Sequence, residues 1–364
     1  VFASVWGTGS VLGAFVIAFT IPNMFRRLFG EGALSEAFVP VFNEELSRAG
    51  KRAAFLLLTQ VVVLVGMLLL GICAVGLGLA LLLRGVIPGE LAAQTLAVLP
   101  WVLPYLLFIC LAGLLAGVLQ SFGRFAVPAF APVLMNLSLI AAALWLCPRL
   151  RSTEVFEATG LAWAVLFAGV LQLLAQVPVL RRLGYRFKRP PALVSPTVRR
   201  VGRLFVPGMV GAGVYQVNLL CDRLLAGWLG SYAVTSLYYS ERLVYLPVGV
   251  FAVALGAACL PVMSRAFARR EGEQMVSALV YALRHILFLS LPCLAGLLVL
   301  GERIITLVFR RGAFTGESAS ATLAALTFYA VGVPAFAALK IIRHGFYAQQ
   351  DTRTPMRVGV ACMG

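Results

Sequence analysis

The sequence predicts an all-α protein, a polytopic bundle of transmembrane helices. Of its 364 residues, 61% are hydrophobic and only 12% are charged, whereas about 25% are charged in a typical soluble domain. Uncharged runs of the length that crosses a bilayer, about 20 residues, recur along the chain. Lysine and arginine number 30 against 14 acidic residues, and in so apolar a chain this excess is typical of cytoplasmic loops. We therefore expect a phospholipid membrane around the protein and no nucleic-acid partner.

Seven uncharged runs are long enough, or nearly so, to form spanning helices. They lie at 1–25, 53–83, 91–123, 125–148, 158–180, 285–301 and 318–339. Prolines inside several of these runs predict bent helices around a cavity. Membrane proteins tolerate such bends where neighbouring helices or cavity water bind the freed carbonyl groups.

A further stretch is interrupted by two charge pairs, Asp222–Arg223 and Glu241–Arg242. Gly227, Gly230 and Ser231 lie at the centre of the stretch between these pairs, so we place a turn at 228–232. The helices on either side are expected at about 204–228 and 232–262, and each then carries one charge pair inside the bilayer. The prediction is therefore about nine complete spans.

The distribution of basic residues supports this placement. Loops after odd-numbered spans contain 21 of the 30 lysine and arginine residues, loops after even-numbered spans contain 6, and the remaining 3 lie within spans. Because cytoplasmic loops collect basic residues, the loops after odd-numbered spans are expected on the cytoplasmic side. The turn at 228–232 then belongs to the opposite side.

A basic, proline-rich stretch divides the chain into two bundles. We expect a first transmembrane bundle at 1–183, a basic cytoplasmic linker at 184–203 and a second, incomplete bundle at 204–364. The chain begins at Val1 rather than at a methionine, and it ends inside a new apolar run that starts near Met356. We therefore expect a fragment of a longer protein.

Charged residues inside the spans are the first candidates for a functional site. A charge near the bilayer centre costs about 2.5–3.5 kcal/mol on insertion scales, so a helix keeps one where it faces protein or water. The pairs at 222–223 and 241–242 either neutralise each other across a hairpin or line a charged, water-filled cavity. Both readings are open at this point.

The arginine pair Arg26–Arg27 also has two readings. An arginine pair at the end of a span is a common cytoplasmic marker. The residues that follow, from Leu28 to Val39, are too apolar for a solvated loop, which favours a segment tucked into the mouth of the bundle. Arginines held there would suit a substrate with phosphates, because a planar guanidinium binds phosphate through two parallel hydrogen bonds.

The sequence contains no motif that points to an enzyme. It has no phosphate-binding glycine loop, no HExxH and no nucleophile elbow. We expect a transporter rather than an enzyme, and transport driven by ATP would need a separate subunit.

Four segments carry a family signature. They are PNMFRRLFGEGALSEAFVP at 22–40, FGRFAVPAFAP at 122–132, YYSERL at 238–243 and GFYAQQDTRTP at 345–355. Together they resemble the MurJ/MviN lipid II flippases of the MOP transporter superfamily. The resemblance implies a two-bundle transporter of the bacterial inner membrane, of which this chain would hold the second to tenth helices and the start of the eleventh. It also implies alternating-access transport of lipid II, the undecaprenyl-pyrophosphate-linked peptidoglycan precursor, for cell-wall synthesis.

The resemblance assigns roles to three arginines. Arg26 and Arg27 match the family's cavity arginine pair, and Arg242 matches the cavity arginine of its eighth helix. They would hold the pyrophosphate while the prenyl tail stays in lipid. Gly13 is a departure, because many members have an aspartate there.

The resemblance also concerns ion coupling and partners. Asp222 looks like an aspartate that joins a sodium site in some members, and Glu241 and Glu31 are candidate counter-ions for the arginines. No other metal and no cofactor is expected, and sodium or the membrane potential would drive transport. We expect a monomer, with an association with the cell-wall synthesis machinery left open.

Two other functions compete with this one. The first is a related MOP-superfamily exporter, either an O-antigen-type flippase or a drug or cation antiporter. An antiporter for cationic drugs would be expected to use carboxylates, whereas the matched cavity residues here are mainly arginines. The second is a non-transporting membrane scaffold, which predicts charge pairs neutralised by direct contact.

Overall fold

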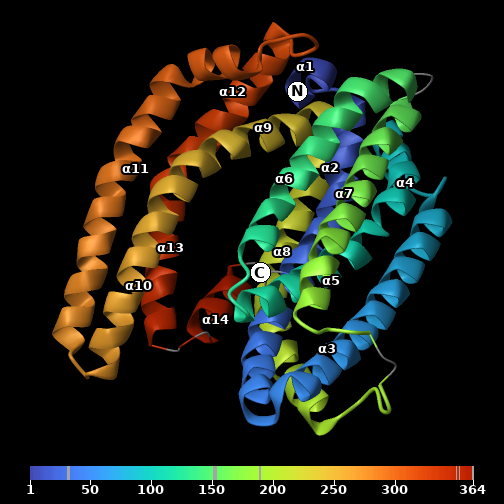
Figure 1. Ribbon diagram of the computed structural model, residues 1–364. Coiled ribbons are helices and arrows are strands. Elements are labelled where there is room, and N and C mark those ends of the chain that lie inside the picture. Colours follow the sequence, from blue (N-terminus) through green and yellow to red (C-terminus); the bar gives the residue numbers. More distant parts are fainter. Residues whose placement is uncertain (31–32, 151–153, 188–189, 350, 352, 363–364) are drawn as a thin grey trace. The chain divides into compact units, whose positions relative to one another are not determined.

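The computed structural model describes residues 1–364 except 31–32, 151–153, 188–189, 350, 352 and 363–364. The described residues form helices and no strands (Figure 1). In chain order the helices are α1 (Phe2–Trp6), α2 (Ser10–Phe25), η1 (Arg26–Gly30), α3 (Ala33–Leu83), α4 (Glu90–Val102), α5 (Tyr105–Ser121), α6 (Ala126–Ala141), η2 (Ala142–Leu146), η3 (Cys147–Leu150), α7 (Glu154–Arg182), α8 (Pro196–Leu229), α9 (Ser231–Pro247), η4 (Val248–Ala252), α10 (Val253–Ala268), α11 (Gly272–Phe309), α12 (Gly316–Val331), α13 (Val333–Ala348) and α14 (Arg353–Ala361). The predicted all-α class is confirmed.

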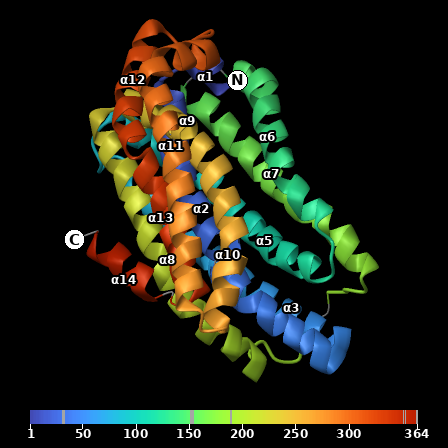
Figure 2. The ribbon, with the colours of Figure 1, turned by 90° about the vertical axis from the view of Figure 1, so that its left-hand side faces the viewer.

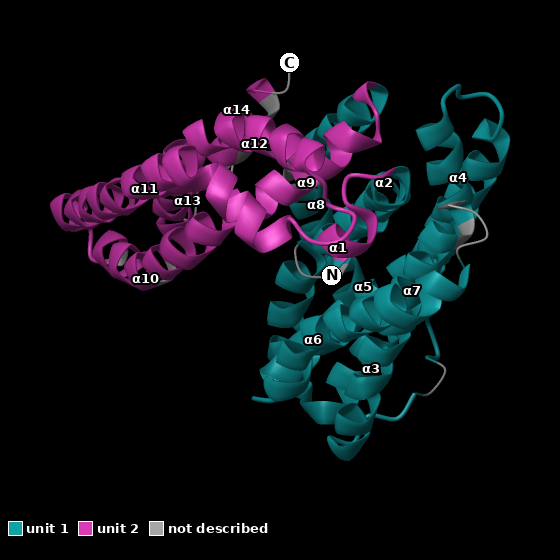
Figure 3. Cartoon of the chain, turned by 90° about the horizontal axis from the view of Figure 1, so that it is seen from above, with its two compact units in different colours: residues 1, 10–228 teal, residues 2–9, 229–364 magenta. Residues whose placement is uncertain are grey.

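The helices divide into two compact units (Figure 3). Unit 1 contains residues 1 and 10–228, and unit 2 contains residues 2–9 and 229–364. In unit 1, α7 packs against α2, α4, α5 and α6. In unit 2, α11 packs against α10, α12 and α13, while α9 packs against α12 (Figure 2).

Several helices have the length and composition of membrane spans. Among the described residues there are five such helices, or up to seven if each bent helix pair counts as one span. The first of the five is the stretch Ser10–Leu83, which includes the predicted span at 53–83 and most of the predicted span at 1–25. The predicted span at 204–228 is helical and lies within α8. It is not among these candidates, and the number nine stays a prediction.

The predicted turn between the two charge-bearing helices is confirmed. α8 ends at Leu229 and α9 begins at Ser231. The residue between them, Gly230, has φ 117° and ψ 172°. Side chains disfavour this backbone region, whereas glycine adopts it readily. The break between the helices therefore falls at the position that the glycines indicate.

Bends are present at two of the predicted places, and each lies beside a proline. α4 and α5 meet at an angle of 48° beside Pro104, and α12 and α13 meet at 44° beside Gly332 and Pro334. The wide helical turn η4 follows Pro247 directly. Proline removes a backbone donor and its ring clashes with the preceding turn, which explains bends at these positions.

The linker between α7 and α8 lies against α3. The side-chain amide of Gln60 donates to the carbonyl oxygen of Ala192 at 2.7 Å and accepts from the hydroxyl of Ser195 at 3.0 Å. Ser195 also accepts from the backbone N–H of Val198, in the first turn of α8, at 3.2 Å. A buried glutamine of α3 thus fixes the start of α8.

The contacts of α8 group it with unit 1. The ring of Phe205 lies 5.2 Å from that of Phe29. Gly208 packs against Ala33, and Gly227 packs against Ile17. The boundary between the units therefore falls after residue 228, whereas the predicted second bundle begins at 204. The predicted boundary follows the linker sequence rather than contacts, and it stays a prediction.

Candidate functional site

The arginine pair lies on a wide helical turn at the end of α2. η1 is a π-helical turn. This geometry is rare in proteins as a whole, but where it occurs it is often at a functional site. The Nε of Arg26 donates to Oδ1 of Asn23 at 3.0 Å, and Arg26 is half-buried. Arg27 is exposed. One arginine is therefore hydrogen-bonded to an asparagine of the preceding turn, and the other is exposed.

The apolar residues after the arginine pair are buried, as predicted. Leu28 is 6% exposed and Phe29 3%. The first part of α3 continues this pattern, with Phe38 and Phe42 fully buried and their rings 5.5 Å apart. The arginine turn is thus fixed to unit 1 by the apolar residues that follow it.

Arg242 lies on α9 in unit 2, within reach of a tyrosine one turn earlier. Its Cζ is 4.9 Å from the ring centroid of Tyr238, and its Nη2 donates to the Tyr238 hydroxyl at 3.3 Å. Arg242 is exposed, while Tyr238 is half-buried. The arginine therefore has one face against an aromatic ring and remains accessible.

The predicted acidic residues fall in different parts of the chain. Asp222 is exposed on α8 in unit 1, and its neighbour Arg223 is buried. Glu241 is half-buried on α9 in unit 2. Glu31 lies outside the described residues. The roles of these residues as sodium ligand or counter-ions stay predictions.

The structure thus brings two of the three predicted arginines to a polar partner in their own unit. Arg26 is joined to Asn23 in unit 1, and Arg242 to Tyr238 in unit 2. Sequence reasoning missed both partners. The signal was present, because Asn23 precedes Arg26 by three residues and Tyr238 precedes Arg242 by four, the spacings that place side chains on one helix face.

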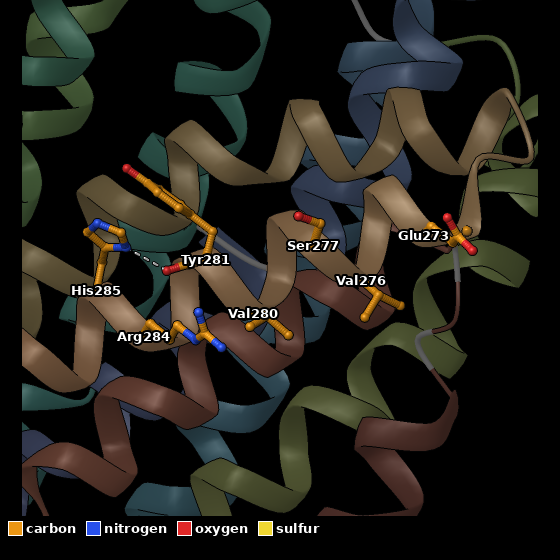
Figure 4. Close-up of a pocket in the computed structure, with 8 residues that line it drawn as sticks. Glu273, Val276, Ser277, Val280, Tyr281, Arg284 and His285 are labelled. Carbon is orange, nitrogen blue, oxygen red and sulfur yellow. Dashed lines mark hydrogen bonds between the residues drawn. The ribbon is translucent and has the colours of Figure 1, made fainter.

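The structure also has an open groove along α11 that the sequence did not indicate. Its volume is about 750 Å³, and all its lining residues come from the first half of α11: Gly272, Glu273, Val276, Ser277, Val280, Tyr281, Arg284 and His285 (Figure 4). The rings of Tyr281 and His285 lie 3.9 Å apart, and His285 Nδ1 is 2.8 Å from the Tyr281 carbonyl oxygen. The groove contains none of the predicted site residues.

The apolar helices of the two units define a multi-pass membrane protein with the helical fold of the MOP superfamily. The structure matches a solved structure described as "Lipid II flippase MurJ, inward closed conformation", with TM-score 0.82 and 24% identity over 99% of this chain and 74% of that chain. It also matches an inward-facing multidrug resistance MATE transporter of the MOP superfamily, with TM-score 0.80 and 18% identity over 98% of this chain and 82% of that chain. At these identities the likeness concerns the fold.

The chain belongs to the MurJ family. The family model described as "Lipid II flippase MurJ" matches residues 2–364. The protein named probable lipid II flippase MurJ of Vibrio cholerae is 33% identical over 381 residues, which cover 100% of this chain and 71% of the relative. The resemblance seen in the four sequence segments is thereby confirmed.

Proposed function

We propose that this protein is a lipid II flippase of the bacterial inner membrane. It would move the undecaprenyl-pyrophosphate-linked peptidoglycan precursor from the cytoplasmic to the outer leaflet for cell-wall synthesis. The observation that carries this proposal is the family match over residues 2–364, joined to relatives named as lipid II flippases. The half-buried Arg26 at the end of an apolar helix supports it, because such a position suits an anionic headgroup.

In this proposal the three arginines bind the pyrophosphate. A guanidinium offers five N–H donors in a planar fork, and paired hydrogen bonds to phosphate are charge-assisted and therefore strong. Arg26 and Arg27 supply two such groups from unit 1, and Arg242 supplies one from unit 2. Their positive field would also attract the headgroup toward the site.

Alternating access would expose the bound headgroup first to one side of the membrane and then to the other. An inside-negative potential acts on mobile charge at about 2.3 kcal/mol per charge for each 100 mV. An excess of positive charge moving with the empty site would thus couple transport to the potential. A sodium ion at Asp222 is the other candidate for coupling, with Glu241 and Glu31 as counter-ions of the arginines.

The proposal describes a transporter without catalytic chemistry. It would act as a monomer, and an association with the cell-wall synthesis machinery would deliver its substrate or remove it. No residue of the chain is assigned to bond making or breaking.

Complementation tests the proposal. The full-length gene is expressed in a bacterial strain depleted of its own flippase, with Arg26→Ala, Arg242→Ala and, as control, Arg310→Ala, which alters an exposed arginine at the end of α11. We expect the wild type and the control to restore growth and lipid II flipping, and both site variants to fail at normal expression levels. If the site variants restore both, the arginine mechanism is wrong.

The same experiment separates this function from a drug or cation antiporter. An antiporter would leave the depleted strain unable to grow, while raising the tolerance of cells to cationic dyes. A scaffold without transport would restore neither growth nor flipping. Growth with lipid II flipping is the result that the flippase proposal requires.

A further inference from the structure

The side chain of Arg242 lies beside Tyr238, a tyrosine to which the proposed function gives no role. We propose that Tyr238 is a positioning residue, which holds the Arg242 guanidinium in the orientation that receives a phosphate. This inference rests on the proposed function, since it assigns Arg242 to the pyrophosphate. The inference adds a residue that favours anions of the right shape, whereas the charge of Arg242 favours any anion.

Two contacts between the same two side chains define the geometry. The Arg242 Cζ lies 4.9 Å from the centroid of the Tyr238 ring, and Nη2 donates to the Tyr238 hydroxyl at 3.3 Å. The ring contact limits tilting of the guanidinium, and the hydrogen bond limits its rotation. The bond to Tyr238 uses one of five N–H donors, so an edge of the guanidinium remains for a bidentate anion.

Tyr238 is in turn held by a buried neighbour. Its ring meets the ring of Tyr239 edge to face at 5.7 Å. Tyr239 is 3% exposed and donates its hydroxyl to the carbonyl oxygen of Gly7 at 3.0 Å. The rings of Phe309 and Phe314 pack on Tyr239 at 5.0 and 5.4 Å. Tyr238 therefore packs against an aromatic cluster within unit 2.

Orientation matters here because Arg242 is exposed and its side chain is long. An unrestrained arginine samples many rotamers and loses that freedom when it binds an anion, which weakens binding. A side chain already held in the binding orientation avoids most of this loss. Tyr238 would thus improve affinity without touching the phosphate itself.

The test uses purified full-length protein in lipid nanodiscs, with lipid II as the probe. Tyr238→Phe removes the hydrogen bond and keeps the ring, and we expect about fivefold weaker binding. Tyr238→Leu also removes the ring, which adds a further loss of about 2–5-fold. Tyr238→Trp keeps an aromatic face and should bind better than the leucine variant. The matched controls are Tyr232→Phe and Tyr232→Leu, at an exposed tyrosine of the same helix, with unchanged affinity expected.

A double-mutant cycle separates positioning from a general structural role. In an Arg242→Ala background, Tyr238→Leu should change lipid II affinity by less than about twofold, because no guanidinium is left to orient. The melting temperature of each variant is measured in parallel. If Tyr238→Leu weakens binding equally with and without Arg242, the positioning proposal is overturned.

The outcomes also distinguish this inference from the proposed function. If Arg242→Ala itself leaves lipid II affinity unchanged, the assignment of Arg242 to the pyrophosphate fails. If Arg242→Ala weakens binding while Tyr238→Phe and Tyr238→Leu do not, the flippase site stands and the role of Tyr238 is refuted.

Discussion

The buried hydroxyl of Tyr239 provides a sharp test of how α1 is held within unit 2. Tyr239→Phe removes the bond to the carbonyl oxygen of Gly7 and keeps the ring contacts with Phe309 and Phe314. Gly7 is buried, so its carbonyl loses this partner in a place that water does not readily reach. Removing the donor of a buried hydrogen bond leaves the acceptor without a partner, and this costs about 1–3 kcal/mol of stability. Tyr239→Leu should cost more, by about 0.5–1.5 kcal/mol for each aromatic pair.

The expected loss has both a global and a local readout. Globally, the free energy of unfolding in a denaturing detergent should fall by about 1–3 kcal/mol for Tyr239→Phe. The control is Tyr232→Phe, at an exposed ring, and its free energy of unfolding should stay within about 0.5 kcal/mol of wild type. Locally, the backbone N–H of Ala313 donates to the carbonyl of Ser4 at 2.9 Å, which joins α1 to the α11–α12 loop. Hydrogen exchange at Ala313 should accelerate in the phenylalanine variant. Unchanged stability together with unchanged exchange at Ala313 would refute the reasoning.

Two further predictions concern unit 1. Gly117→Leu should lower the free energy of unfolding by about 1–3 kcal/mol in the same assay, because a Cβ at this position would approach Cγ2 of Val39 to 2.7 Å. Val39→Ala should restore part of this loss in the leucine variant. A lack of rescue would contradict this packing. Glu44→Gln removes a 2.8 Å ion pair with Arg200 in which both side chains are about half exposed. Its effect on the unfolding midpoint should be small and should shrink further as salt is raised, whereas a large effect that persists at high salt would show that the pair is not screened.

Much of the local structure follows from sequence because it depends on neighbouring residues. The turn at Gly230 is an example, since glycine tolerates a backbone conformation that other residues avoid. The burial of Leu28 and Phe29 is another, because residues that apolar are not left in water. The bend beside Pro104 likewise follows from the proline itself.

Contacts between distant segments could not be predicted in this way. The Tyr239 hydroxyl binds Gly7, and these residues are 232 positions apart in the sequence. Nothing in the local pattern around either residue indicates the other. The grouping of α8 with unit 1 is similar, because it depends on Phe205 meeting Phe29 rather than on the basic linker that precedes the helix.

Both arginine sites share one structural principle, which bears on transport. Arg26 is oriented by Asn23, and Arg242 by Tyr238, in each case a residue three or four positions earlier in the same unit. One partner of each of these guanidinium groups therefore lies inside its own unit. On the proposed function, each of these two arginines would keep its partner while the bound headgroup is exposed first to one side of the membrane and then to the other.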